Sequence, residues 1–135
     1  MSCMKLFIAM ASTAVLSAGT AYAECSYPTP PDHLPDGNTA TLQEMVTAQK
    51  AVKDYDKAIN AYVACIQLER DDAVSKLAVK PGETPTAEQK KAIEDRQRVE
   101  IQKHNAAIDQ LQSVADRFNE QVKVYKAKNA DKPKG

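Results

Sequence analysis

The apolar residues between positions 41 and 78 follow the pattern of one long helix. This stretch contains no glycine and no proline, and apolar residues recur in it at every seventh position, with a second apolar series three positions after the first. The two series are Met45, Val52, Ile59, Ile66 and Ala73, and then Ala48, Tyr55 and Tyr62. A stripe with a mean spacing of 3.5 residues is typical of a helix that packs along a second helix. Thr41 and Glu44 form a capping-box pattern before it, so we predict a helix over 42–78.

A second stretch, from 86 to 127, repeats this pattern. Its two series are Ile101, Ile108, Ala115 and Val122, and then His104, Leu111, Phe118 and Tyr125. Thr86 and Gln89 form another capping-box pattern, and Pro81, Gly82 and Pro85 separate this stretch from the first one. A short connection makes consecutive helices antiparallel neighbours. The sequence therefore predicts an all-α fold, an antiparallel two-helix hairpin of coiled-coil type over 41–128, with helices over 42–78 and 86–127.

The two stripes are expected to face each other along one seam. The predicted seam residues are Met45, Val52, Tyr55, Ile59, Tyr62, Ile66, Ile101, His104, Ile108, Leu111, Phe118 and Val122. Other apolar residues lie off its centre, namely Val46, Val63, Leu68, Ile93, Val99 and Val114. Apolar residues outside a hairpin seam favour a further contact. We therefore predict a weak homodimer in which two hairpins form a four-helix bundle.

Residues 1–23 have the pattern of a secretory signal peptide. Lys5 precedes an apolar run from Leu6 to about Ala18, and small residues with the pattern Ala-Tyr-Ala end the segment. The run is shorter than the roughly 20 residues that a membrane-spanning helix needs. We expect cleavage after Ala23 and a periplasmic or secreted protein; a retained N-terminal anchor is the alternative.

The segment 24–40 is rich in proline and is predicted to be an extended arm. It contains Pro28, Pro30, Pro31 and Pro35, and then the pair Asp36-Gly37. Proline fixes the backbone φ angle and removes a hydrogen-bond donor, so a helix is excluded here. The arm should end in a turn just before the first helix.

Two cysteines, Cys25 and Cys65, remain after removal of the predicted leader. An even pair in an exported chain favours a disulfide over a reactive thiol or a metal-binding pair. An extended arm is long enough to fold back along the first helix and bring Cys25 to Cys65. The disulfide would stabilise a hairpin that has only a small hydrophobic core. Residues of the arm would then cover Ala58, Ala61 or Leu68 near Cys65.

Length and charge limit the classes of function. The chain has 135 residues, enough for one domain, and its formal net charge is zero, which argues against a strongly basic nucleic-acid-binding protein. It lacks the usual hydrolase, metalloprotease, phosphate-loop and calcium-loop spacings. His104 is expected to be a hydrogen-bonded seam residue and His33 a solvated loop residue, with a ligand role as the less favoured reading of each. No catalytic residue, cofactor or metal is predicted.

Lysines are concentrated near the C-terminus, where 129–135 is predicted to be a flexible basic tail. They are Lys123, Lys126, Lys128, Lys132 and Lys134. Such lysines either complement the helix dipole, which is the favoured reading, or contact an anionic membrane surface.

Two segments, PDGNTATLQEMVTAQKAVKDYDKAINAYVACIQLE and VADRFNEQVKVYKAK, resemble a group of small exported proteobacterial proteins. The shared features are a leader, a PDG turn, an EMxxAQxxVK helix start, a mid-helix cysteine and a late RFNxxV. The resemblance implies an exported helical hairpin and no catalytic activity. We therefore expect a non-catalytic structural or interaction protein of the cell envelope, with an unidentified envelope protein as a further partner. The alternatives are a holdase-like periplasmic chaperone that binds apolar segments and a small-ligand or metal carrier.

Overall fold

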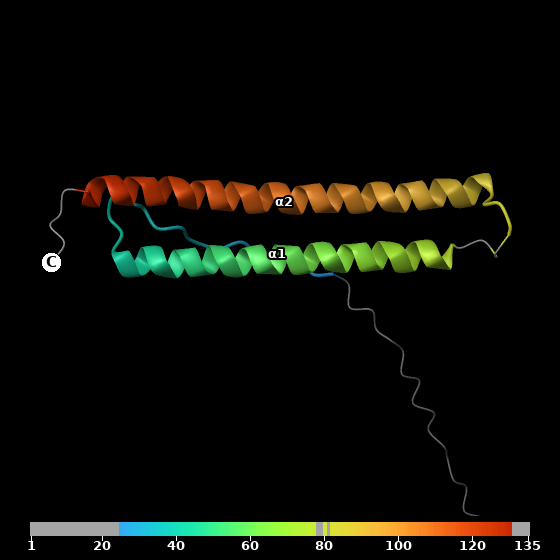
Figure 1. The fold of residues 1–135 in the computed structure, drawn as a ribbon, viewed down its shortest axis with the longest axis horizontal. Helices are drawn as coiled ribbons and strands as arrows, with labels where there is room; N and C mark the ends of the chain where they lie inside the picture. The colour runs from blue at the N-terminus through green and yellow to red at the C-terminus, as the bar shows by residue number, and fades with distance from the viewer. Residues whose placement is uncertain (1–24, 78–79, 81, 131–135) are drawn as a thin grey trace, which may run out of the picture.

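Two long antiparallel helices, joined at one end, make up the body of the molecule (Figure 1). The structure is a computed structural model that describes residues 25–77, 80 and 82–130. Helix α1 spans Leu42–Lys76 and helix α2 spans Ala87–Asn129, and the two pack against each other. The predicted all-α hairpin is thereby confirmed. The predicted leader, 1–23, and most of the predicted tail lie outside the described residues.

Both helices begin where the sequence predicts, at a complete capping box. Thr41 accepts a hydrogen bond from the Glu44 N–H, and the Glu44 carboxylate accepts one from the Thr41 N–H at 2.7 Å. Thr86 and Gln89 form the same reciprocal pair before α2. Each box satisfies N–H groups that a helix start otherwise leaves unpaired.

The ends of the helices differ slightly from the prediction. Helix α1 ends at Lys76 rather than at 78, and the Leu77 N–H donates to the Val74 carbonyl at 3.0 Å. Helix α2 continues to Asn129, two residues beyond the predicted end, since nothing before Pro133 breaks it. Among the described residues, neither helix is long and apolar enough to cross a membrane.

The core follows the predicted stripe of α1 closely. Its buried residues are Met45, Ala48, Tyr55, Ile59, Tyr62 and Ile66. Val52 of the predicted seam is partly buried and packs against the same cluster. The heptad pattern therefore identifies the inner face of α1 correctly.

On α2 the observed seam is turned by one residue from the predicted one. The residues buried there are Ala107, Val114 and Phe118. Leu111 and Phe118 occupy the seam as predicted, but Ala107 and Val114 replace Ile108 and Ala115, which lie at its edge.

Two expectations about α2 are therefore wrong. Ile101, predicted on the seam, is 53% exposed, and Val114, predicted off its centre, is fully buried. The buried residues Ala107, Val114 and Phe118, with Leu111 between them, recur in steps of four and three, so they form a helix stripe as regular as the predicted one. This stripe buries Ala107 and Val114 and leaves Ile108 and Ala115 beside it.

The arm, 25–40, runs beside α1 and ends in a turn that contacts the last part of α2 (Figure 1). Within the turn, the Asp36 carbonyl accepts hydrogen bonds from the Thr39 and Ala40 N–H groups. The Gly37 N–H donates to Gln121 Oε1 at 2.8 Å. The arm is therefore held by α2 at one end, 84 residues away in sequence.

Gly37 approaches the backbone of α2 so closely that no side chain fits. A Cβ atom at this position would lie 2.2 Å from the Gln121 carbonyl oxygen and 2.7 Å from the Tyr125 nitrogen. We expect Gly37→Ala to displace the turn and to lower the free energy of unfolding by about 1–3 kcal/mol, the usual range for overpacking. Urea unfolding monitored by circular dichroism measures the change. The exposed neighbouring variant Thr39→Ala is the control, and an equally small effect of both would contradict the close contact.

Candidate functional site

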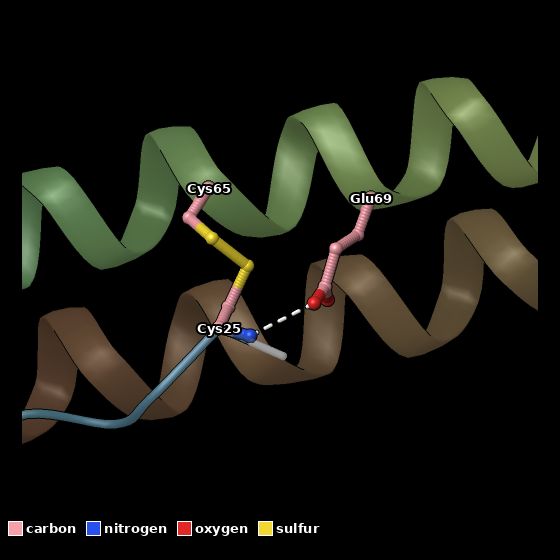
Figure 2. A group of neighbouring side chains, drawn as sticks. All are labelled: Cys25, Cys65 and Glu69. Atoms are coloured by element: carbon pink, nitrogen blue, oxygen red, sulfur yellow. Dashed lines mark hydrogen bonds between the residues drawn. A yellow bond between two sulfur atoms is a disulfide. The ribbon is translucent and has the colours of Figure 1, made fainter. Parts of the chain in front are cut away.

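The first described residue of the arm, Cys25, is joined to the middle of α1. Cys25 and Cys65 form a disulfide with a Cα–Cα distance of 5.8 Å, as the sequence predicts. Glu69 lies one helical turn beyond Cys65, and its Oε1 accepts a hydrogen bond from the Cys25 N–H at 2.9 Å (Figure 2). Because Cys65 and Glu69 are four residues apart, they share one face of α1. This junction therefore fixes both the side chain and the backbone of Cys25.

The same three residues could in principle offer ligands to a cation. One ligand atom from each of Cys25, Cys65 and Glu69 lies within 4.8 Å of the other two. Metals are bound by thiolates, however, and the two sulfur atoms are bonded to each other. In this oxidised form the cluster acts as a covalent and hydrogen-bonded junction.

Tyr27 of the arm lies close to two buried tyrosines of α1, Tyr55 and Tyr62. The ring of Tyr27 packs edge-on against Tyr62, with a centroid distance of 5.0 Å. Burial raises the pKa of the Tyr62 and Tyr55 hydroxyls, and the neighbouring Tyr27 raises both further. The arm therefore closes over the aromatic part of the core, which keeps these two hydroxyls neutral.

Because of these raised pKa values, the free energy of unfolding should fall at alkaline pH. The unfolded chain ionises tyrosine near pH 10, while the folded chain keeps these two neutral to a higher pH. Their contribution is therefore fully present below about pH 10 and is lost as the pH rises through the folded-state pKa values. We expect Tyr55→Phe to match the parent near neutral pH and to lose less free energy of unfolding above about pH 10. Urea unfolding of both proteins, near neutral pH and above about pH 10, measures this difference. If the parent and Tyr55→Phe lost the same free energy of unfolding at the alkaline pH, the prediction would be wrong.

The two histidines lie in different surroundings. His33 is exposed and borders a groove of about 510 Å³ between the arm and the start of α1, which Asp36 and Glu44 also line. Hydrogen bonds from the Thr41 N–H and hydroxyl lower the pKa of the Glu44 carboxyl, so this carboxylate already serves the helix cap.

His104 is partly buried on the inner side of α2. Its Nδ1 lies 3.2 Å from Asn105 Oδ1. Neither histidine belongs to a group of three possible metal ligands among the residues that the structure describes.

The described lysines of the predicted basic segment are partly occupied by the protein itself. Lys128 Nζ donates to the Asn38 carbonyl, which adds a second link between α2 and the arm turn. Lys123 forms an ion pair with Glu120 at 3.2 Å, and Lys126 is exposed. Lys132 and Lys134 lie outside the described residues. Lys128 therefore helps to hold the arm turn on α2, a contact that the charge pattern of the sequence did not predict.

A row of small side chains on α1 lies beneath the arm. Ala51, Ala58 and Cys65 follow one another at heptad spacing, and they line shallow grooves together with arm residues between Cys25 and Pro31. Small residues let an extended backbone approach a helix closely. The prediction that the arm covers Ala58 or Ala61 is not confirmed, because both residues are exposed beside it. Leu68, also predicted under the arm, is 70% exposed.

The half of the hairpin near the connection has no such cover. Between residues 67 and 106, no described residue is buried. Leu68, Val99 and Ile101 are among the large apolar residues that remain exposed. The arm and the disulfide thus divide the hairpin into a covered half and a bare half.

The side-chain chemistry of the described residues is mostly local. The ion pairs join residues at most four positions apart, such as Lys50 with Asp54 and Lys76 with Asp72. Contacts of this type stabilise helices and do not assemble a reaction centre. Compared with protein-family models, with curated proteins and with solved structures, the chain matches none.

Proposed function

We propose that this chain is a non-catalytic interaction protein of an oxidising, extracytoplasmic compartment. In this role, the hairpin presents preformed helical surfaces to other proteins. The proposal includes export by the leader 1–23 and release of a mature chain that begins at Glu24. A disulfide is stable in such a compartment and uncommon in a reducing cytoplasm, which supports this location.

The observation that carries the proposal is the attachment of the arm at both of its ends. Cys25 is bonded to α1, and the turn at Gly37 and Asn38 is hydrogen-bonded to α2. A surface fixed in advance loses little conformational entropy when it binds, so it can support specific contacts without a deep pocket. A rigid frame with a bare half suits an interaction protein better than an enzyme.

A holdase-like chaperone is the second candidate, and the bare half of the hairpin favours it. Exposed apolar residues such as Leu68 and Val99 could bind unfolded segments. A holdase captures many clients, whereas an interaction protein captures few. The number of captured species therefore distinguishes the two functions.

Photo-crosslinking in cells that export the full chain tests the proposal. A photoreactive residue replaces Leu68 or Ile101 in the bare half, and the exposed polar Lys57 is the control position. One or two discrete adducts at the test positions, absent from the control, support an interaction protein. A continuous smear supports the holdase, and no adduct at either test position overturns both. The intact mass of the exported protein, expected to start at Glu24, checks the compartment independently.

A further inference from the structure

A second apolar row, outside the hairpin seam, runs along α2. It consists of Ile101, Ile108, Ala115 and Val122, which recur at every seventh position. These residues were predicted to form the seam, but the structure places them at its edge, where Ile101 is 53% exposed and the others are partly buried. The row spans about 32 Å at 1.5 Å per residue. Ile108 and Val122 also pack against the two core clusters, so the hairpin uses the inner side of this row, while Ile101 remains exposed.

Amide side chains accompany this row at regular intervals. Asn105, Gln112 and Asn119 are also seven residues apart, and they fall between the aliphatic residues in steps of four and three. None of the seven positions is charged, although 27% of the residues in the chain are. Together the two rows have the alternating spacing of a coiled-coil seam, in which an amide at a core position specifies register and partner. We call these seven positions the uncharged face.

The arm lies on the other side of α2. Arm residues line a common groove with Arg117 and Gln121, and Gly37 contacts the backbone of Gln121 and Tyr125. Ala115 is two residues from Arg117 and is therefore turned by about 200° around the helix. The uncharged face is consequently open to another molecule while the arm stays in place.

We propose that the uncharged face is the contact between two copies of this chain, which pair through antiparallel α2 helices. The proposal rests on the interaction role proposed above and names the partner of that role. A two-fold axis near Gln112 lays the aliphatic row of one copy on the aliphatic row of the other, and the amide row on the amide row. The larger Ile108 then lies near the smaller Ala115 of the second copy, so the two surfaces fill each other's space.

The chemistry of the face fits a copy of itself better than an unrelated partner. An amide donates and accepts hydrogen bonds, so a row of amides satisfies an identical row. The face itself carries no charge, although Asp109 and Asp116 lie beside it, and repulsion between these carboxylates across the two-fold axis adds to the weakness of the pairing. At one end of the face, the charge of Arg98 is balanced by Asp95 at 2.7 Å.

The size of the face sets the strength of the dimer. A contact about 32 Å long and about 10 Å wide, the diameter of a helix, buries about 320 Å² on each copy. The area buried on both copies together lies below the roughly 1,200 Å² of stable interfaces, so the pairing is weak and reversible. We expect the dimer to appear between about 10 µM and 1 mM protein.

Cysteine crosslinking locates the contact without disturbing the core. In purified, oxidised protein with a short bismaleimide, Gln112→Cys should give a crosslinked dimer as the main product. Ser113→Cys, exposed and about 100° further round α2, is the control and should stay monomeric. Equal crosslinking of both variants, or none with Gln112→Cys at about 1 mM, overturns the proposal.

Charge exchange tests the antiparallel register. Ile108→Lys and Ala115→Glu should each lose the dimer in sedimentation equilibrium, and an equimolar mixture should regain it, because the introduced ammonium of one copy meets the introduced carboxylate of the other. Circular dichroism confirms that each variant is folded; if one is not, the crosslinking result decides. A mixture of folded variants that stays monomeric refutes the register. Discrete adducts to other proteins in the cell experiment, with no self-association here, would leave the interaction role standing and remove only this partner.

Discussion

Ile59→Asp should unfold the hairpin. Ile59 is fully buried at the centre of the larger core cluster, where it lies with Tyr55 and Tyr62 of α1 and Val114 of α2. Aspartate removes the aliphatic contacts and places a charge where no partner can reach it. We expect a loss of about 4 kcal/mol or more in the free energy of unfolding, which is a large part of the stability of a small domain.

Far-UV circular dichroism at increasing urea concentration measures this loss. The control is Glu94→Ala, an exposed position near the start of α2, for which we expect little change. If both variants unfolded at the same urea concentration, the central role of the seam would be wrong.

Loss of the disulfide should have the second largest effect. Cys25 and Cys65 are separated by 40 residues, and closing a loop of this length contributes about 4 kcal/mol in the chain-entropy model. Cys65→Ser also frees the arm, so Tyr27 no longer has a fixed position on Tyr62. We expect the melting temperature to fall by about 15 °C or more.

Calorimetry of Cys65→Ser beside the parent protein gives this shift, and treatment of the parent with a dithiol should reproduce it. Thiol titration of the untreated, unfolded parent should find no free thiol from Cys25 or Cys65. An unchanged melting temperature would show that the arm adds nothing to the helix pair.

The hairpin itself could be predicted because its signals are local and repeated. Two capping boxes mark the helix starts, and heptad spacing marks the inner face of α1 over more than three turns. The orientation of α2 could not be predicted in the same way. Ile108 and Val114 are both aliphatic and both keep the three-and-four spacing with Leu111 and Phe118, so the spacing alone does not show which of the two is buried.

The candidate site was predictable where it depends on covalent chemistry. The pairing of Cys25 with Cys65 was predicted from the even number of cysteines left after the predicted leader. The contact of Gly37 with Gln121 does not, because a Pro-Asp-Gly sequence predicts a turn and says nothing about the surface on which the turn lies. Long-range backbone approaches of this type leave no periodic trace in a sequence.

The two attachments of the arm also imply an order of assembly as the chain is made. Cys25 and Cys65 both precede α2, so the covalent loop can close before the second helix exists. The contacts of the turn involve Gln121 and Lys128, in the last part of α2, and can form only after the loop residues and most of α2 have been made. A chain interrupted before Gln121 would carry a closed loop with an untethered turn, a form that a protease could distinguish from the finished protein.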